Sequence, residues 1–372
     1  MRQAAASVPL AAGRPAPKSS SAASSGSGSR TRGNPLPLLD QRARGARFYS
    51  HLVRSVLNTP ESTGIGCWSF NPYVGCEFGC TYCYARFAHR YVLERARDTG
   101  RVSSAEFAKL RGPNGWEGFE HQIFVKDRSA LLEALDRDLP RLLSRNVSGD
   151  GETLLIGSST DPYQPAERRF EITKAALERL LREHGLTIGI ITKSSLICRD
   201  TELLAALSQR HRVLVNVSLI STDPALIKLL EARSPAPHVR LRTLRRLTQC
   251  GVTAGVLVAP ILPGITDSLE NLRLLLEAAK AHGACFAHPS PLRLYPAVRP
   301  LLLPVIQQRF PSLAARYREA YHGLGRAPKE YHAALVRRFE RIAQVIGIPT
   351  QSEPRAAAGV ERQLNLWPEQ RP

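Results

Sequence analysis

Apolar runs and amphipathic segments alternate from about residue 64 to about residue 295. Strands are predicted over 66–73, 121–126, 153–160, 186–194, 212–220, 252–261 and 284–294. Several of these are nearly continuous runs of Val, Ile and Leu, which is typical of parallel strands covered on both faces. Helices are predicted between them and at the C-terminal end of the chain, over 85–98, 129–143, 173–185, 200–210, 239–251, 266–283, 301–310, 313–323 and 329–347.

Within this pattern, Pro140 is a candidate interruption of the second helix. Gly185 and Gly251 are expected to end two others, and Thr266 or Asp267 to cap the start of another. About six strand–helix units indicate an α/β fold. That is fewer than the eight of a closed barrel, so a partial TIM-like barrel of (β/α)6 type is predicted, with a doubly wound sheet as the alternative. In both, ligands bind at the C-terminal ends of the strands.

Composition adds a charge argument. The 372 residues carry a formal net charge of +19, which suggests a polyanionic partner, nucleic acid first. A generally basic composition of the organism's proteins is an equally good explanation. No apolar run is long enough for a membrane span. The seven cysteines do not form a disulfide framework, so a reducing compartment, the cytoplasm, is predicted, with one metal site.

Three of the cysteines, Cys76, Cys80 and Cys83, lie in the segment NPYVGCEFGCTYCYAR after the first predicted strand. Structural zinc normally takes four protein ligands, for which His89 is the available fourth. A four-iron cluster held by only three thiolates has one iron with an open coordination position. That open iron can bind a substrate or cofactor directly.

With Tyr82 before the third cysteine, this C-x3-C-x2-C spacing resembles the radical SAM signature. The longer NPYVGC…CTYCYAR match resembles the spore photoproduct lyase-like group, over roughly residues 64 to 295. The resemblance implies a [4Fe–4S] cluster on Cys76, Cys80 and Cys83, and S-adenosylmethionine that is cleaved reductively to a 5′-deoxyadenosyl radical. It further implies a reductant of flavodoxin or ferredoxin type and, because lyases of this group repair a thymine photodimer, DNA as a candidate substrate.

Further residues are carried over by position. Tyr82, Thr160, Asp161, Lys193 and Ser218 are expected to contact S-adenosylmethionine, and Tyr84 to lie near the reacting atoms. Alternatives remain: Asp161 can cap a turn with Pro162, Lys193 can be solvated, Ser218 can bond to the backbone, and Tyr84 can pack the cysteine loop.

One departure from the lyase pattern concerns its last step. The lyase has a hydrogen-donating cysteine two residues before the Ser-Asp pair that Thr160 and Asp161 match, and this chain has Ser158 there. An O–H bond is too strong to replace the thiol. Cys198 or Cys67 could serve instead, although lone cysteines are more often small core residues.

The expected organisation is a disordered basic arm (1–45), a radical SAM partial barrel (46–298), C-terminal helices (299–348) and a flexible tail (349–372). In the tail, Gln363-Leu364-Asn365-Leu366-Trp367 is similar to the peptide by which bacterial repair proteins bind the sliding clamp. The alternative functions are the same radical chemistry on a protein or small molecule, and a non-catalytic nucleic-acid-binding protein with a structural metal.

Overall fold

Two β-sheets and their covering helices make up the part of the chain that the computed structural model describes, residues 37–42, 45–63, 65–111, 118–146, 153–323 and 325–350. The strands of the larger sheet, in spatial order, are β11 (Ala287–Pro291), β10 (Thr253–Ile261), β9 (Arg212–Ser218), β8 (Thr187–Thr192), β7 (Thr153–Ile156), β4 (Trp68–Phe70) and β3 (Leu57–Asn58).

The larger sheet is a partial barrel. From β4 to β11 all neighbouring strands are parallel and follow one another in sequence order, with pairs such as Ile156↔Ile190. A doubly wound sheet would reverse its strand order at a switch point, and this one does not. Only the edge strand β3 runs antiparallel, against β4. The predicted partial (β/α)6 barrel is therefore confirmed.

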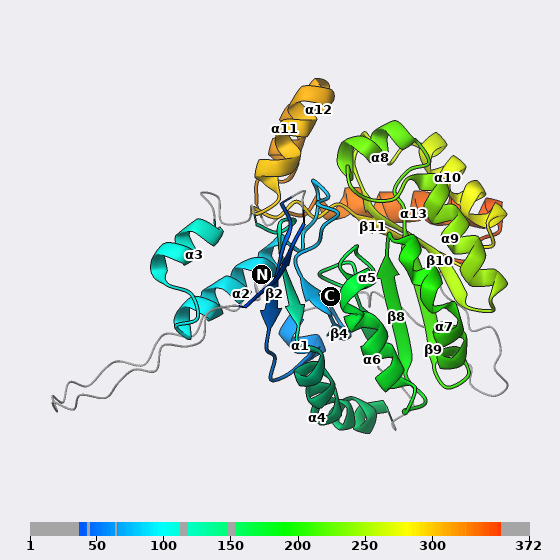
Figure 1. Cartoon of the computed structure of the whole chain (residues 1–372). Coiled ribbons are helices and arrows are strands. Elements are labelled where there is room, and N and C mark those ends of the chain that lie inside the picture. The colour runs from blue at the N-terminus through cyan, green and yellow to red at the C-terminus, as the bar shows by residue number, and fades with distance from the viewer. Residues whose placement is uncertain are drawn as a thin grey trace, which may run out of the picture.

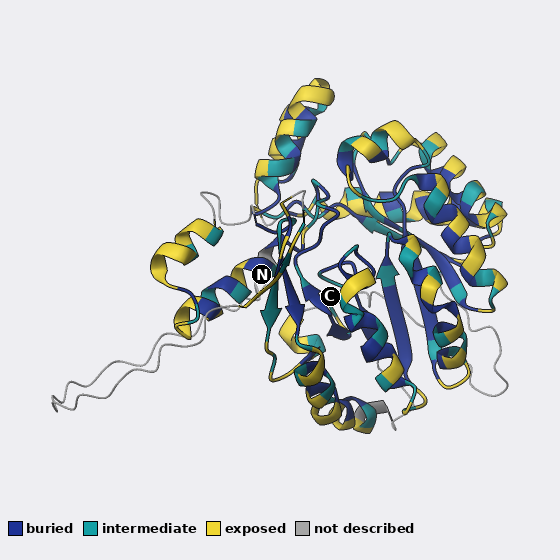
Figure 2. Cartoon of the chain, in the orientation of Figure 1, coloured by how far each residue is buried: buried dark blue, intermediate teal, exposed yellow. Residues whose placement is uncertain are grey.

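Helices cover the outer face of the barrel, and the strands between are buried (Figures 1 and 2). Ile188, Ile190 and Val215 are completely inaccessible to solvent, as expected for apolar runs enclosed on both faces. The helices of this region are α1 (Pro60–Thr63), α2 (Arg86–Asp98), α3 (Ser104–Arg111), α4 (Arg128–Asn146), α5 (Glu167–Phe170), α6 (Ile172–Leu180), the 3₁₀ helix η1 (Ser195–Asp200), α7 (Thr201–Ser208), α8 (Pro224–Leu230), α9 (Pro237–Gln249) and α10 (Leu269–Ala281).

A second, smaller sheet pairs β1 (Leu38–Gln41), β2 (Arg47–His51), β6 (Gln122–Lys126) and β5 (Tyr73–Val74), in that order. The predicted strand at 121–126 therefore exists but belongs to this sheet rather than to the barrel. Strand β1 corrects the predicted arm, since its backbone pairs with β2 instead of being disordered. Residues 1–36 of that arm lie outside the described residues.

Helix details differ from the prediction in three places. Helix α4 continues through Pro140, whose neighbour Leu139 is fully buried. Helix α6 ends at Leu180, before Gly185. The N-cap of α10 is Ser268, whose hydroxyl accepts from the amide of Asn271.

Neither residue predicted to cap α10 is available for that role. The Thr266 hydroxyl accepts from the Leu262 amide, and the Asp267 carboxylate accepts from the Gly264 amide, at 2.8 and 2.7 Å. Both side chains therefore hold the turn before the helix.

The C-terminal helices are α11 (Arg299–Arg309), α12 (Pro311–Ala320) and α13 (Lys329–Ile346). Helix α13 packs on α10 and β11, and the Pro349 carbonyl after it accepts from the Ala287 amide at 2.8 Å. Helices α11 and α12 pack on each other and stand out from the rest of the chain (Figure 1). The segment 363–367 lies outside the described residues, so clamp binding stays a prediction.

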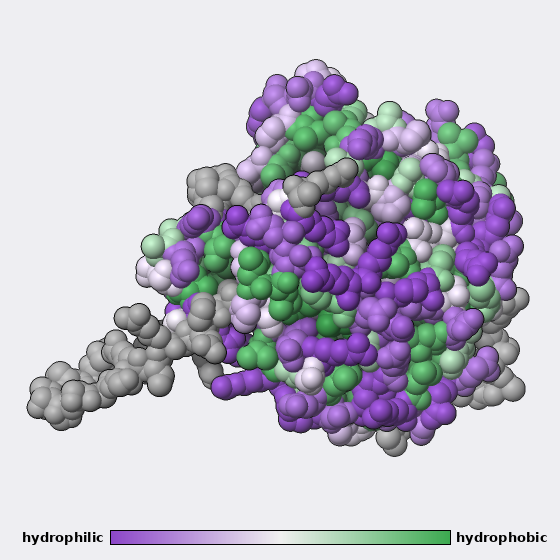
Figure 3. Space-filling view, in the orientation of Figure 1, coloured by the Kyte–Doolittle hydropathy of each residue, from purple (hydrophilic) through white to green (hydrophobic). Residues whose placement is uncertain are grey.

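The face of the molecule in Figure 3 is largely hydrophilic, with small scattered apolar areas. Within the described ranges, no helix is long and apolar enough to cross a membrane.

Candidate active site

A pocket opens among the loops that follow the barrel strands. Its wall comes from the cysteine loop, from the C-terminal halves of β7, β8, β9, β10 and β11, and from residues that follow β7, β8 and β11. Most of the predicted site residues line this one pocket: Cys76, Cys80, Tyr82, Cys83, Tyr84, Ser158, Thr160, Asp161, Lys193 and Ser218. These residues are far apart in sequence, and parallel strands bring them to the same edge of the barrel.

The cysteine loop owes its course to Gly75. This residue has φ +90°, and an added Cβ would lie 2.8 Å from the carbonyl oxygens of Phe119 and Gln122. The close approach lets the Cys76 amide donate to the Phe119 carbonyl at 3.0 Å. A short turn follows, in which the Gly79 amide donates to the Cys76 carbonyl. The second sheet, which supplies β5 and β6 on either side, therefore supports the loop.

The three thiols suit a bound cationic cluster. Burial raises the pKa of Cys76, of Cys80 (to about 12) and of Cys83. The other thiols add to the shift at Cys76, and Cys83 adds to it at Cys80. Buried thiolates need a cation to be stable, and iron supplies one. Thiolates are also the ligands that iron–sulfur clusters take. The donor set therefore fits a [4Fe–4S] cluster.

The zinc alternative fits less well. His89, its candidate fourth ligand, has its Nε2 atom 3.2 Å from the carbonyl of Gln122 and its ring against Phe124. Among the described residues, no three His, Cys, Asp or Glu side chains converge closely enough to hold a single metal ion.

Thr160 holds the cysteine loop. Its hydroxyl donates to the Gly75 carbonyl at 2.7 Å, and the side-chain amide of Gln164 donates to the same carbonyl at 3.1 Å. The Gln164 side-chain carbonyl in turn accepts from the Glu77 amide at 2.9 Å. The segment after β7 thus clamps the loop from both sides of Cys76.

Asp161 organises the ends of β7 and β8. One carboxylate oxygen accepts from the Tyr163 amide and the Thr192 hydroxyl, and the other accepts from the Lys193 amide at 2.7 Å. The bond to the Tyr163 amide caps the turn at Pro162, which was the expected alternative to a contact with S-adenosylmethionine. Burial raises the pKa of Asp161 in spite of these bonds.

Lys193 brings a partly buried cation to the pocket. Desolvation opposes its charge, but the neighbouring Cys80 thiol and the carboxylates of Glu231 and Asp161 outweigh it, so the pKa of Lys193 is raised. Its Nζ lies 5.9 Å from the ring centroid of Tyr82. The ammonium therefore remains charged beside the cysteine loop.

Tyr82 and Ser218 are joined through a buried ion pair. The Tyr82 hydroxyl donates to Glu231, which pairs with Arg240. Arg240 also donates to the Ser218 carbonyl at 2.9 Å. The Ser218 hydroxyl donates to the Ala259 carbonyl at 3.4 Å. A bond to the backbone was the expected alternative to a contact with S-adenosylmethionine.

Ser158 and Tyr84 both line the pocket and are joined by a hydrogen bond. The side-chain amide of Asn71 donates to the Ser158 hydroxyl at 3.0 Å, and its carbonyl accepts from the Ser159 amide at 2.8 Å. The Tyr84 hydroxyl donates to the backbone carbonyl of Ser158. Burial raises the pKa of Tyr84 to about 12, so the phenol stays protonated.

The structure does not bring the two candidate donor cysteines into the pocket wall. Cys198 lies in η1, which packs against α9, beside Thr243 and Arg246. Cys198 is not among the residues that line the pocket, and its catalytic role stays a prediction. Cys67 immediately precedes β4 and is not among the residues that line the pocket, and burial raises the pKa of its thiol to about 11.

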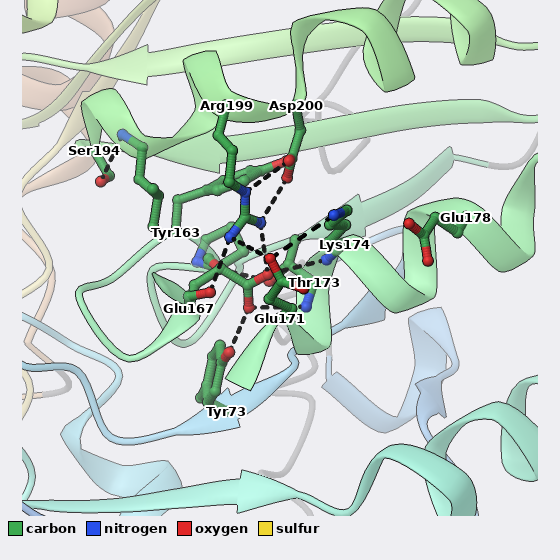
Figure 4. Close-up of polar contacts among 12 residues, drawn as sticks. Tyr73, Tyr163, Glu167, Glu171, Thr173, Lys174, Glu178, Ser194, Arg199 and Asp200 are labelled. Atoms are coloured by element: carbon green, nitrogen blue, oxygen red, sulfur yellow. Dashed lines mark hydrogen bonds and ion pairs between the residues drawn. The ribbon is translucent and has the colours of Figure 1, made fainter. Parts of the chain in front are cut away.

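Several supporting residues were not predicted: Asn71, Gln164, Glu231 and Arg240. A second buried carboxylate, Glu167, accepts from Tyr73, the amides of Thr173 and Lys174, and Arg199 (Figure 4). Glu231 lies in the segment EARSP and Arg240 in PHVRL. Nothing in these segments distinguishes the two charges from those of an ordinary surface helix. Only the fold shows that these charges are buried.

Comparisons with known proteins agree with this geometry. The chain matches the model of the Radical SAM superfamily over residues 70–276. It is 32% identical over 304 residues to an uncharacterized protein of Mycobacterium tuberculosis (strain ATCC 25618 / H37Rv), with 81% of each chain covered. It is 26% identical over 198 residues to an uncharacterized protein of Methanocaldococcus jannaschii, covering 53% of this chain and 61% of that one.

Among solved structures, the fold is similar to spore photoproduct lyase with bound AdoMet and dinucleoside spore photoproduct. The TM-score is 0.54 at 15% identity, covering 80% of this chain and 79% of the lyase. A second lyase structure gives a TM-score of 0.55. The expected lyase-like fold is confirmed. The chain belongs to the radical SAM superfamily, and its cofactors are a [4Fe–4S] cluster and S-adenosylmethionine.

Proposed function

We propose that this enzyme generates a 5′-deoxyadenosyl radical and uses it to abstract a hydrogen atom from DNA, in a reaction of the lesion-repair type. One observation carries the proposal: the three thiols, Lys193 and Ser218 line a single pocket at the C-terminal ends of the barrel strands. Hydrogen abstraction requires the cofactors and the substrate to share one enclosed site, because a primary radical reacts with whatever lies closest.

In this proposal Cys76, Cys80 and Cys83 hold the cluster, which supplies the electron for cleavage of S-adenosylmethionine when it is bound. The Lys193 ammonium pairs with the methionyl carboxylate of the cofactor. The Asp161 oxygen that accepts from the Lys193 amide has a further lone pair and can take the cofactor's ammonium. The Thr160 hydroxyl donates to the Gly75 carbonyl, so Thr160 holds the cysteine loop as well as lining the site for S-adenosylmethionine.

The electron comes from a one-electron donor of flavodoxin or ferredoxin type. All seven cysteines are free. Free thiols persist in a reducing compartment, and we place the enzyme in the cytoplasm on that ground.

DNA is favoured as the substrate by two observations. The net charge of +19 suits a polyanion. In addition, the structurally similar lyase binds a dinucleoside photoproduct. The lyase's thiol-dependent last step is not part of the proposal, because Ser158 occupies the position of its donor cysteine.

Anaerobic reconstitution with iron and sulfide, followed by dithionite and S-adenosylmethionine, tests the radical chemistry. We expect 5′-deoxyadenosine from the wild type and none from Cys76→Ala, Cys80→Ala or Cys83→Ala. Cys198→Ala is the matched control and should retain activity, since Cys198 faces α9. Absence of product from a wild type that holds iron would favour the non-catalytic metal-binding alternative.

A second arm of the experiment tests the substrate. Ultraviolet-irradiated, uniformly deuterated DNA is added, and 5′-deoxyadenosine is analysed by mass spectrometry. Deuterium should appear in the nucleoside. Product that forms without deuterium would favour a protein or small-molecule substrate.

A further inference from the structure

Glu231 and Arg240 form an ion pair in which both side chains are completely buried. Arg240 also donates to the carbonyls of Pro235 and Ser218 at 2.8 and 2.9 Å. The Ser234 hydroxyl donates at 2.8 Å to the same Glu231 oxygen that pairs with Arg240. A buried pair costs desolvation energy and is often no more stabilising than apolar residues of the same volume. Its presence beside the pocket therefore calls for an explanation other than stability.

The contacts of the pair lead to pocket residues on two sides. Glu231 accepts from the hydroxyl of Tyr82, which lies between two of the cluster ligands in sequence. The adjacent Leu230 carbonyl accepts from the Thr81 amide at 3.0 Å. Arg240 fixes the Ser218 carbonyl at the end of β9. The end of α8 and the start of α9 thus anchor the cysteine loop to the barrel.

The charges of the pair also act on the pocket. Glu231 accepts from Tyr82, two residues after Cys80, and Arg240 donates to the carbonyl of Ser218, which lines the pocket. At this burial, solvent screens little of these interactions. A change in the charge balance of the pair would therefore be felt at the position of the cluster.

We propose that the Glu231–Arg240 pair is a positioning element of the cofactor site, which fixes Tyr82 in the cysteine loop and sets the charge environment of the cluster at Cys80. The proposal rests on the proposed function, because it assumes that the cluster and S-adenosylmethionine occupy this pocket. It assigns no contact between the pair and either cofactor.

Glu167 and Arg199 provide a matched comparison within the same fold. Glu167 is also completely buried, accepts from a tyrosine hydroxyl and lies 3.2 Å from an arginine. Its partners Tyr73, Thr173 and Arg199, which Figure 4 draws around it, are not among the residues that line the pocket. Loss of either carboxylate leaves an arginine with a weaker partner, but only Glu231 accepts from a residue that lies between two cluster ligands in sequence, Tyr82.

The test uses the full-length reconstituted protein without S-adenosylmethionine. Glu231→Gln preserves the shape of the side chain and removes its negative charge, so the unbalanced Arg240 cation should make the cluster easier to reduce. We expect an EPR-monitored redox titration to give a less negative midpoint potential than the wild type, and a smaller shift or none in Glu167→Gln. Equal shifts in both variants, or no shift in Glu231→Gln, would overturn the proposal.

Tyr82→Phe covers the case in which Glu231→Gln does not hold a cluster. It removes one hydroxyl and leaves the ion pair in place. We expect about tenfold weaker binding of labelled S-adenosylmethionine by equilibrium dialysis, since a hydrogen bond to a charged group is lost. Unchanged affinity contradicts the positioning role. If the wild type cleaves S-adenosylmethionine and the variants match its midpoint potential and its affinity for S-adenosylmethionine, only this inference fails. If the wild type does not cleave S-adenosylmethionine, the proposed function itself is overturned.

Discussion

His89 illustrates how burial decides the role of a residue near the cysteine loop. Only 1% of its surface is exposed, and its ring lies between α2 and β6 against Phe124. Burial lowers the pKa of His89 to about 4, so the imidazole is neutral at physiological pH. With Nε2 directed at the Gln122 carbonyl, it connects the helix after the loop to the second sheet.

This lowered pKa predicts a pH-dependent contribution to stability. Because the unfolded chain binds a proton at His89 below about pH 6.5 and the folded chain does so only below about 4, stability is lost as the pH falls through this window. We expect the difference in unfolding free energy between wild type and His89→Gln to shrink by about 3 kcal/mol from pH 7 to pH 4. Urea denaturation of the cluster-free protein measures it. Parallel pH profiles of the two proteins would contradict the assignment.

At the scale of elements, the cysteine loop depends on a sheet that lies outside the barrel. Strands β5 and β6 pair antiparallel, and the carbonyls of Phe119 and Gln122 crowd Gly75 from that side. The loop can follow this course only with a residue that lacks a Cβ and accepts a positive φ. The course of the cysteine loop is therefore set by a contact within the second sheet, between the end of β5 and the start of β6.

Gly75→Ala should consequently displace the loop and lower the iron content after reconstitution well below that of the wild type. Gly251→Ala is the control, because Gly251 has a similar φ of +79° with nothing within 4 Å of an added Cβ. It should cost about 1 kcal/mol of stability and keep its iron. Colorimetric iron determination separates the two outcomes. A Gly75→Ala protein with full iron would show that the loop can shift without losing the cluster.

The barrel was predictable from sequence and the second sheet was not, for a physical reason. Enclosed strands such as β8 and β9 need an apolar residue at nearly every position, which makes them visible in any window of the sequence. Strands β1, β2 and β5 are short and mixed in polarity. Likewise, the cysteine spacing is local, whereas Glu231 and Arg240 form a functional unit only once α8 and α9 have packed.

On the scale of the whole molecule, positive charge is spread over the described domain and the segment before it. Residues 1–36 hold five of the basic residues and no acidic one, so their removal lowers the net charge from +19 to +14. If the charge serves DNA binding, each phosphate contact releases counterions and steepens the salt dependence of affinity.

We therefore expect DNA binding by the full chain to weaken steeply with salt, and a 37–372 variant to have a shallower slope of log affinity against log salt, by up to about 4. Fluorescence anisotropy with a labelled duplex at several salt concentrations measures both slopes. Cleavage of S-adenosylmethionine should be retained by the shortened protein, since the pocket lies within the described residues. A salt-independent affinity would indicate that the charge reflects overall composition instead.

Ser158 and Thr160 lie two residues apart on one loop but are held by different parts of the molecule. Thr160 is tied to Gly75 and hence to the cluster ligands, whereas the Ser158 side chain is tied to Asn71 at the end of β4. The bond from Tyr84 reaches only the Ser158 backbone and is indifferent to the residue type. A substitution at position 158 should therefore leave the contact between Thr160 and the cysteine loop in place, so that the side chain at this point of the pocket wall can vary independently of the residues that hold the loop.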